Sequence, residues 1–201
     1  MVQNDNVTGL ILAGGAGTRV GGQDKGLLPW RGKTLVEHVT QRLHTQTAEV
    51  LISCNRSLRE YQSLGFRTVQ DRLPNFQGPL AGIEAAMDFV KTDYLLVVAC
   101  DTPLLPLDLA TRLMAPLLQS GDPAPLISFA HDGQRGQYLF ALLNRRCQPS
   151  LAAFLAQGHR SVKQWYQQIP HEVVDFSDQT ESFQNYNYVS AATEGPPGVS
   201  T

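Results

Sequence analysis

The sequence has few cysteines, no long hydrophobic run and no excess of basic charge. Its three cysteines (Cys54, Cys100 and Cys147) form no C-x-x-C pair, which argues against a disulfide framework or zinc site and fits a reducing cytoplasm. No apolar stretch approaches the roughly 18 residues of a membrane span, and residues 1–6 lack the features of a signal peptide. The net charge of −2 gives no indication of nucleic-acid or membrane binding, so any affinity for phosphate must be local.

What the sequence does have is an alternation of apolar runs and helical patterns. This order indicates an α/β fold whose mostly parallel sheet is covered on both faces, in one domain over residues 1–190. The composition of residues 191–201 is that of a disordered tail. The predicted strands are Val7–Ala13, Val50–Cys54, Phe66–Val69, Tyr94–Cys100, Leu126–Ala130, Tyr138–Asn144 and His171–Phe176. The predicted helices are Thr34–Thr45, Ser57–Leu64, Pro79–Val90, Pro106–Gln119, Cys147–Gln157 and Ser161–Gln168, with Glu37 completing a capping box on Thr34 and with Pro79 and Pro106 in first turns.

A glycine-rich segment directly after the first strand is the most informative feature. Residues 12–25 read LAGGAGTRVGGQDK, with the cations Arg19 and Lys25 among the glycines. Glycines let backbone N–H groups approach an anion, so the segment favours a polyphosphate over a plain flexible turn. It is not a P-loop, because Leu27 stands where that motif needs its first glycine. Nor is it a dinucleotide fingerprint, because Val20 stands where glycine or alanine is required.

Polar residues follow several other strands at what we expect to be the same edge of the sheet. In an open parallel sheet, ligands bind beyond the carboxyl ends of the strands. Asn55 follows the second strand, Asp71 the third and Asp101 the fourth, while His131 and Arg135 follow the fifth. The sequence therefore predicts a ligand site assembled from several strand ends.

Asp101 is the strongest single candidate, because it follows the most apolar strand. Mg²⁺ is held by one or two carboxylates together with substrate phosphates, so Asp101 is a candidate metal ligand; a turn or helix-capping aspartate is the alternative. Lys25 is a candidate for binding the α-phosphate and Arg19 for the leaving pyrophosphate, unless both are solvated surface cations. Asp71 suits hydrogen bonds to a base or ribose, or an ordinary turn.

The remaining candidates have equally plain structural alternatives. Small residues from Gly78 and Pro79 onward permit close ligand approach, and packing explains them as well. His131 and Arg135 suit a second anionic substrate or a simple hairpin. Asn185 and Asn187 bracket a tyrosine and suit metal or phosphate binding, or a turn. No nucleophile stands beside a base, and Cys100 reads as a buried, inert thiol. Phosphoryl-type transfer fits this set, since it needs positioning and charge neutralisation.

With these residues in hand, the chain resembles the MobA-type molybdenum cofactor guanylyltransferases over roughly residues 8–189. The resemblance implies a single-domain, three-layer, Rossmann-like nucleotidyltransferase fold. It also implies Mg²⁺-dependent transfer of GMP from GTP to the terminal phosphate of molybdenum-bound molybdopterin, in the cytoplasm, with molybdoenzymes and their chaperones as further partners. The motifs that carry it are Leu12-Ala13-Gly14-Gly15 with Arg19, Gly21 and Lys25; Asp71; Gly78-Pro79-Leu80-Ala81-Gly82; Cys100-Asp101-Thr102-Pro103; and Asn185-Tyr186-Asn187.

The resemblance also orders the candidate residues by role. Its implied catalytic residues are Arg19, Lys25 and Asp101, with Asp101 as the metal ligand. The expected nucleotide-binding set is Leu12, Ala13, Gly14, Gly15, Lys25, Ser53, Asn55, Asp71, Gly78, Pro79 and Asp101. The expected acceptor-binding set is His131, Arg135, Asn185 and Asn187.

There are departures from the family pattern, and alternatives remain open. Ser53 stands where the family has asparagine, so a contact to base or ribose is weaker here or shifts to Asn55. The cytidylyltransferase of the same cofactor has alanine at one of the positions of Gly14 and Gly15. Sugar-phosphate nucleotidyltransferases place their lysine further along than Lys25. A GTP-binding cofactor chaperone is the non-enzymatic alternative.

Overall fold

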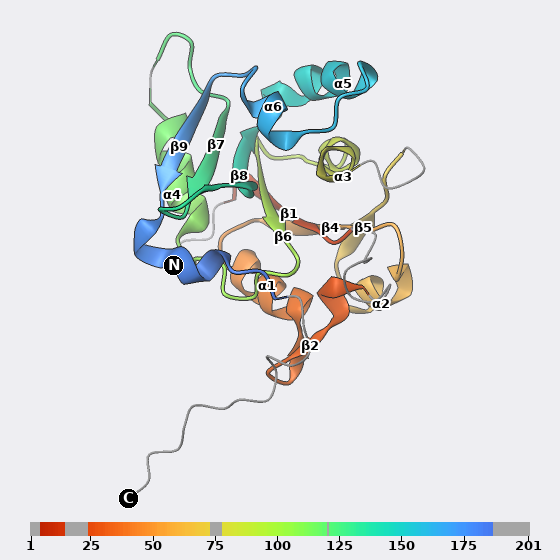
Figure 1. The fold of residues 1–201 in the computed structure, drawn as a ribbon. Helices are drawn as coiled ribbons and strands as arrows, with labels where there is room; N and C mark the ends of the chain where they lie inside the picture. The colour runs from red at the N-terminus through yellow and green to blue at the C-terminus, as the bar shows by residue number, and fades with distance from the viewer. Residues whose placement is uncertain (1–4, 15–23, 73–77, 120, 187–201) are drawn as a thin grey trace, which may run out of the picture.

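A seven-stranded sheet forms the centre of the molecule. The computed structural model describes residues 5–14, 24–72, 78–119 and 121–186. The strand order is β5-β4-β1-β6-β8-β7-β9 (Figure 1). Neighbouring strands are parallel except that β8 runs antiparallel to both β6 and β7. The strands are β1 (Val7–Leu12), β4 (Glu49–Ser53), β5 (Arg67–Val69), β6 (Tyr94–Ala99), β7 (Ile127–His131), β8 (Gly136–Asn144) and β9 (His171–Asp175).

Helices cover both faces of the sheet and make it the middle of three layers. Side chains of α3, α5 and α6 pack in one apolar cluster, and those of α1, α2 and α4 pack in another on the opposite face (Figure 1). The helices are α1 (Leu35–His44), α2 (Leu58–Ser63), α3 (Pro79–Met87), α4 (Leu109–Leu117), α5 (Gln148–Ala156) and α6 (Val162–Tyr166). Among the described residues, no helix combines the length and the apolarity that a membrane span requires.

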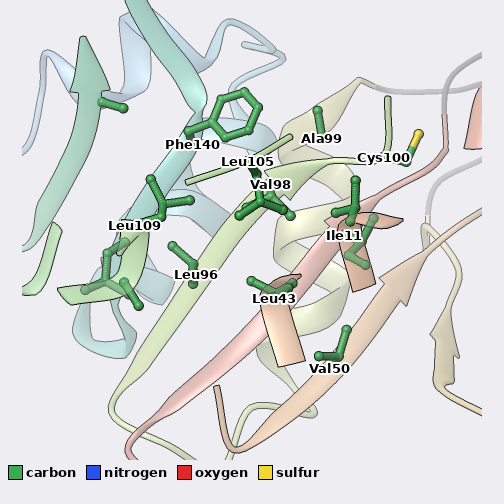
Figure 2. Packing of buried hydrophobic residues seen from close by; sticks show 14 of the residues in the cluster. Ile11, Leu43, Val50, Leu96, Val98, Ala99, Cys100, Leu105, Leu109 and Phe140 are labelled. Atoms are coloured by element: carbon green, nitrogen blue, oxygen red, sulfur yellow. The ribbon is translucent and has the colours of Figure 1, made fainter. Parts of the chain in front are cut away.

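The central strands are buried on both faces, which explains their nearly continuous apolar sequences. Successive side chains of a strand point to opposite faces, so Leu10 enters the cluster of α3 while Ile11 enters that of α1. Figure 2 shows part of the second cluster, with Ile11, Leu43 of α1 and Val98 of β6 among its members. Because both faces of β1 and β6 are covered, the carboxyl ends of these strands are held in fixed positions.

The predicted strands and helices are confirmed, with boundaries shifted by at most three residues. The capping box is present, because Glu37 Oε2 accepts hydrogen bonds from the backbone N–H and the hydroxyl of Thr34, both at 2.7 Å. Pro79 stands in the first turn of α3, as predicted. A two-stranded hairpin of β2 (Pro29–Trp30) and β3 (Lys33–Thr34) was not predicted.

The expected position of Pro106 in the first turn of a helix is wrong. Helix α4 begins at Leu109, with Asp108 as its N-cap residue. The side chain of Gln46 accounts for the later start. Its amide nitrogen donates to the carbonyl of Pro106 at 3.0 Å, and its oxygen accepts from the N–H of Ala110 at 2.9 Å. These bonds hold residues 106–108 outside the helix.

Candidate active site

A cavity of about 330 Å³ opens at the carboxyl ends of β1, β4 and β6. It lies beyond the carboxyl ends of these strands, the usual ligand position in open α/β sheets. Most of the expected nucleotide-binding residues within the described part of the chain share this cavity. Its lining consists of Leu12, Ala13, Gly14, Lys25, Ser53, Asp71, Gly78, Pro79, Gly82, Ala99, Cys100, Asp101 and Leu139.

Lys25 and Asp101 meet in this cavity although they are far apart in the sequence. Lys25 begins the 3₁₀ turn η2 (Lys25–Leu27), and its Nζ lies 3.5 Å from Asp101 Oδ2. Both side chains remain partly accessible, at 25% and 11%. Because α4 begins eight residues later at Leu109, with Asp108 as its N-cap residue, Asp101 does not cap that helix. The pair places opposite charges at one wall of the cavity, where a phosphate and a metal ion would each find a partner.

Asp71 is held by a two-way pairing with Asn55. The side-chain nitrogen of Asn55 donates to Asp71 Oδ2 at 2.8 Å, and its oxygen accepts from the Asp71 backbone N–H at 2.9 Å. The other carboxylate oxygen, Asp71 Oδ1, is buried and has no hydrogen-bond partner among the described residues. Burial raises the pKa of Asp71, while the Asn55 hydrogen bond opposes that rise. An unmatched acceptor in a cavity wall is costly unless a ligand supplies the donor.

The pairing also determines what Asn55 can do. Both of its side-chain polar atoms are engaged with Asp71, so Asn55 orients that carboxylate and does not itself line the cavity. Ser53 does line the cavity, beside the start of α3. A Cβ atom at position 82 would lie 2.4 Å from Ser53 Oγ, so the close approach of α3 to β4 requires Gly82.

His131 and Arg135 lie outside the cavity, at the turn that joins β7 to β8. Asp132 organises this turn: its Oδ1 accepts from the N–H groups of Gln134 and Arg135 at 2.8 and 2.7 Å. Nδ1 of His131 accepts from a backbone N–H within the same turn. Since β7 is parallel to β6 and two positions away, the turn lies at the same edge of the sheet, about 10 Å along it. The expected polar loop is thus a hairpin turn.

The backbone at Asn185 lies near that of Asp101 in space. The N–H of the following residue, Tyr186, donates a hydrogen bond to the Asp101 carbonyl at 2.8 Å. The ring of Tyr186 contacts Trp30 of the β2–β3 hairpin, with centroids 5.3 Å apart. The segment that carries Asn185 therefore crosses the end of β6. Gly15, Arg19 and Asn187 lie outside the described residues, as does the predicted tail.

Leu139, Asp24 and Tyr61 are among the residues at or behind the cavity to which the sequence assigned no role. Leu139 lines it because the pairing of β7 and β8 shifts register after Phe129, and β8 separates from β6 beyond Ala141. Asp24 and Tyr61 lie behind the Lys25 turn and are hydrogen-bonded to each other. The role of Asp24 in the turn could have been predicted, because an aspartate two residues before a glycine often accepts a hydrogen bond from the backbone of its own turn. A side chain such as Tyr61, on a predicted helix, carries no such signal.

Comparisons with known proteins agree with this geometry. The family model described as "MobA-like NTP transferase domain" matches residues 9–173. A molybdenum cofactor guanylyltransferase from Polynucleobacter asymbioticus is 40% identical over 188 residues, covering 93% of this chain and 94% of the relative. A protein of the same name from a Shewanella species is 41% identical over 181 residues, covering 90% of each.

Similarity to a solved structure extends the agreement to the fold. The molybdopterin-guanine dinucleotide biosynthesis protein A from Archaeoglobus fulgidus has a TM-score of 0.72, with 92% of this chain and 96% of that chain covered. The identity of 18% is low, so this likeness shows the fold alone.

Proposed function

Since the chain belongs to the family of MobA-like NTP transferases and is a nucleotidyltransferase, we propose that it acts as a molybdenum cofactor guanylyltransferase. In this reaction a terminal phosphate oxygen of molybdenum-bound molybdopterin attacks the α-phosphorus of GTP. The bond from that phosphorus to the bridging oxygen breaks, and pyrophosphate leaves. The observation that carries the proposal is one cavity lined both by the Lys25–Asp101 pair and by Asp71, whose carboxylate keeps one oxygen without a partner among the described residues.

The carboxylate of Asp71 supports guanine as the base. Guanine offers two adjacent donors on one edge, its ring N1–H and its exocyclic amino group, and a carboxylate is an acceptor for both. Cytosine offers a single amino donor beside two acceptors, which a carboxylate repels. Asn55 holds one oxygen of Asp71 and leaves the other for the ligand. A donor left unpaired in such a site would cost about 1–3 kcal/mol, enough to select one base over another.

Lys25 and Asp101 support a triphosphate beside the base. Without ligand they neutralise each other across 3.5 Å. When GTP enters, the ammonium of Lys25 turns to the phosphates, which leaves the carboxylate of Asp101 for a cation. Both side chains are held on rigid elements, a hydrogen-bonded turn and the end of the buried strand β6. Both charges therefore stand at the cavity wall before the phosphates arrive, and only the end of the Lys25 side chain has to reorient.

Magnesium fits this arrangement, although no group of three metal-ligating side chains occurs among the described residues. Mg²⁺ is usually bound through one or two carboxylates with substrate phosphates as the remaining ligands, and Asp101 supplies such a carboxylate at the cavity wall. When bound, Mg²⁺ would supply neutralisation of the phosphate charge. The acceptor would then approach from the side of Leu139 and Asn185, with His131 and Arg135 as the more distant contacts.

A nucleotide panel tests the proposal. Purified protein is mixed with Mg²⁺ and each of GTP, CTP, ATP and UTP, with and without molybdenum-bound molybdopterin, and pyrophosphate release is measured. We expect release with GTP only, and only when the acceptor is present. Faster release with CTP would assign the chain to the cytidylyltransferase of this cofactor. Release with a sugar phosphate as acceptor would indicate a sugar-phosphate nucleotidyltransferase, and GTP binding without release would indicate a cofactor chaperone.

A further inference from the structure

Tyr61 of α2 lies directly behind the turn that carries Lys25. Its side chain is fully buried, and its hydroxyl donates a hydrogen bond to Asp24 Oδ1. The same carboxylate oxygen accepts from the backbone N–H of Gly26 at 3.2 Å. One oxygen of Asp24 therefore joins α2 to the turn that begins with Lys25, across 37 positions of the chain.

The turn is in close contact with this hydroxyl. A Cβ atom at position 26 would lie 2.5 Å from the hydroxyl oxygen of Tyr61 and 3.4 Å from the side chain of Cys100. Only glycine fits between them. The backbone that carries Lys25 is thus packed between α2 on one side and the end of β6 on the other, next to Asp101.

The charge of Asp24 makes the hydroxyl of Tyr61 important. The side chain of Asp24 is 5% exposed, and a buried carboxylate is tolerated only when hydrogen bonds or opposite charge compensate it. Oδ1 receives the two hydrogen bonds from Tyr61 and Gly26, while Oδ2 forms an ion pair with Arg56, whose Nε lies 3.9 Å away. Burial raises the pKa of Tyr61 far above its usual value, so its hydroxyl stays protonated and remains a donor.

We propose that Tyr61 is a positioning residue for nucleotide transfer, which fixes Asp24 and through it the placement of the Lys25 amine at the phosphate end of the cavity. The inference rests on the proposed function only in that Lys25 meets the phosphates of a nucleoside triphosphate. Without the hydroxyl, the Asp24 carboxylate relaxes toward Arg56, the bond to Gly26 weakens, and Lys25 samples positions away from the phosphates.

The first test is Tyr61→Phe, which keeps the ring and removes the hydroxyl. We expect the KM and the Kd for GTP to rise roughly three- to tenfold while kcat stays within about twofold, because a ground-state phosphate contact is weakened. The matched control is Tyr166→Phe. Tyr166 is equally buried and its hydroxyl donates to a backbone carbonyl at 3.0 Å, but it lies on the other face of the sheet. We expect Tyr61→Phe and Tyr166→Phe each to lower Tm by a few degrees. Tyr166→Phe should leave the KM and the Kd for GTP unchanged.

The second test asks whether Tyr61 acts through Lys25. GTP binding is measured by calorimetry for Tyr61→Phe in the wild-type and Lys25→Ala backgrounds. A positioning role predicts that most of the Tyr61→Phe effect disappears when Lys25 is absent. Equal effects in both backgrounds, or an unchanged Kd in Tyr61→Phe, would overturn the inference. If the wild-type protein binds no nucleoside triphosphate at all, the proposed function fails instead, and the two failures are thereby distinguished.

Discussion

Two places at the same edge of the sheet each contain a buried or half-buried aspartate, and the structure uses them differently. Asp71 in the cavity gives one oxygen to Asn55 and keeps the other without a partner among the described residues. Asp132, in the β7–β8 turn, accepts hydrogen bonds at both oxygens, with Gln137 Nε2 on Oδ2 at 2.6 Å. The hydroxyl of Thr180 also donates to the Asp132 carbonyl.

The difference separates residues that hold the fold from residues held ready for a ligand. At the turn, the polar atoms of Asp132 are consumed by the protein itself, which is what a structural aspartate requires. At the cavity, Asp71 keeps one oxygen without a partner among the described residues, and the Lys25–Asp101 pair is long at 3.5 Å and still accessible. Polar atoms without hydrogen-bond partners reduce the stability of the fold. A ligand that supplies those partners regains this energy, so such atoms in a cavity favour ligand binding.

The largest expected effect is that of Asp101→Asn, which keeps the shape and removes the charge. We expect guanylyl transfer to fall by about a hundredfold or more, because the proposed metal ligand is weakened where charge must be neutralised. GTP binding without metal should change little or tighten, since a negative charge near the phosphates is lost. Pyrophosphate release and calorimetry measure the two quantities.

Asp132→Asn is the matched control for that substitution. It should lower stability by roughly 1 kcal/mol, because hydrogen bonds to a carboxylate are weakened, and leave kcat unchanged. If Asp101→Asn retained near-normal Mg²⁺-dependent turnover, or if Asp132→Asn abolished it, the contrast between the two sites would be wrong.

Lys25→Ala should have the next largest effect. A hydrogen bond to a charged group contributes about 1.5–3 kcal/mol, so GTP affinity should fall roughly ten- to a hundredfold. The fold should be little affected, because a partly exposed ion pair adds little stability. Lys33→Ala, an exposed lysine of β3, serves as the control. Unchanged GTP affinity in Lys25→Ala would remove Lys25 from the phosphate site.

Asp71→Asn should weaken GTP binding about tenfold, since removal of the negative charge weakens the hydrogen bonds that guanine donates to this side chain. It should also stabilise the fold, because the buried carboxylate is unfavourable above its ordinary pKa of 3.8. The folded-state pKa of Asp71 is raised, so its destabilising contribution grows as pH rises through that pKa and is relieved as pH falls. Thermal melts of both proteins across pH test this, and a destabilised Asp71→Asn would contradict it.

Asp132 should show the opposite dependence on pH. Burial raises its pKa, but hydrogen bonds from Arg135, Gln134 and Gln137 together bring the pKa below the ordinary value of 3.8. Its stabilising contribution is complete above that value and is lost as pH falls through the lowered folded-state pKa. The melts of Asp132→Asn therefore differ from wild type in the opposite direction to those of Asp71→Asn.

The smallest expected effect is that of Arg135→Ala. The turn lies about two strand spacings from the cavity, so its cation reaches only an extended acceptor. We expect the apparent KM for molybdenum-bound molybdopterin to rise a few-fold, at most about tenfold, with GTP affinity unchanged. A loss of GTP affinity would mean that the turn belongs to the nucleotide site.

Much of the fold could be predicted because the local signals agree with the final structure. The apolar run that ends at Asp101 predicts a buried strand, and parallel strands bring their carboxyl ends together, so the cavity followed from the element order. The direction of β8 did not follow, since alternation of side chains is the same in either direction. Its antiparallel pairing with β6 depends on contacts between segments nearly fifty residues apart.

The sequence was sufficient to predict which residue types form the candidate site. It predicted only some of the contacts between them. The sequence places Asp71 and Lys25 after strands and Ser53 near the end of one, and the structure brings them to one cavity. That they bind nucleotide remains a prediction. The pairing of Asn55 with Asp71 and the contact of Tyr61 with Asp24 are side-chain hydrogen bonds across 16 and 37 positions. Such bonds depend on the packed geometry of β4, β5 and α2, which no local pattern encodes.

The contact between Tyr186 and Trp30 gives the protein an optical reporter of its own. The chain has two tryptophans, and Trp165 is fully buried on the opposite face of the sheet. A Trp165→Phe variant therefore leaves a single indole, bracketed by Tyr186 and His38. The backbone N–H of Tyr186 donates a hydrogen bond to the carbonyl of Asp101. The emission of Trp30 therefore reports whether the segment that carries Tyr186 is attached to the end of β6. Stopped-flow fluorescence would then follow the order in which the two substrates arrive, without any added label.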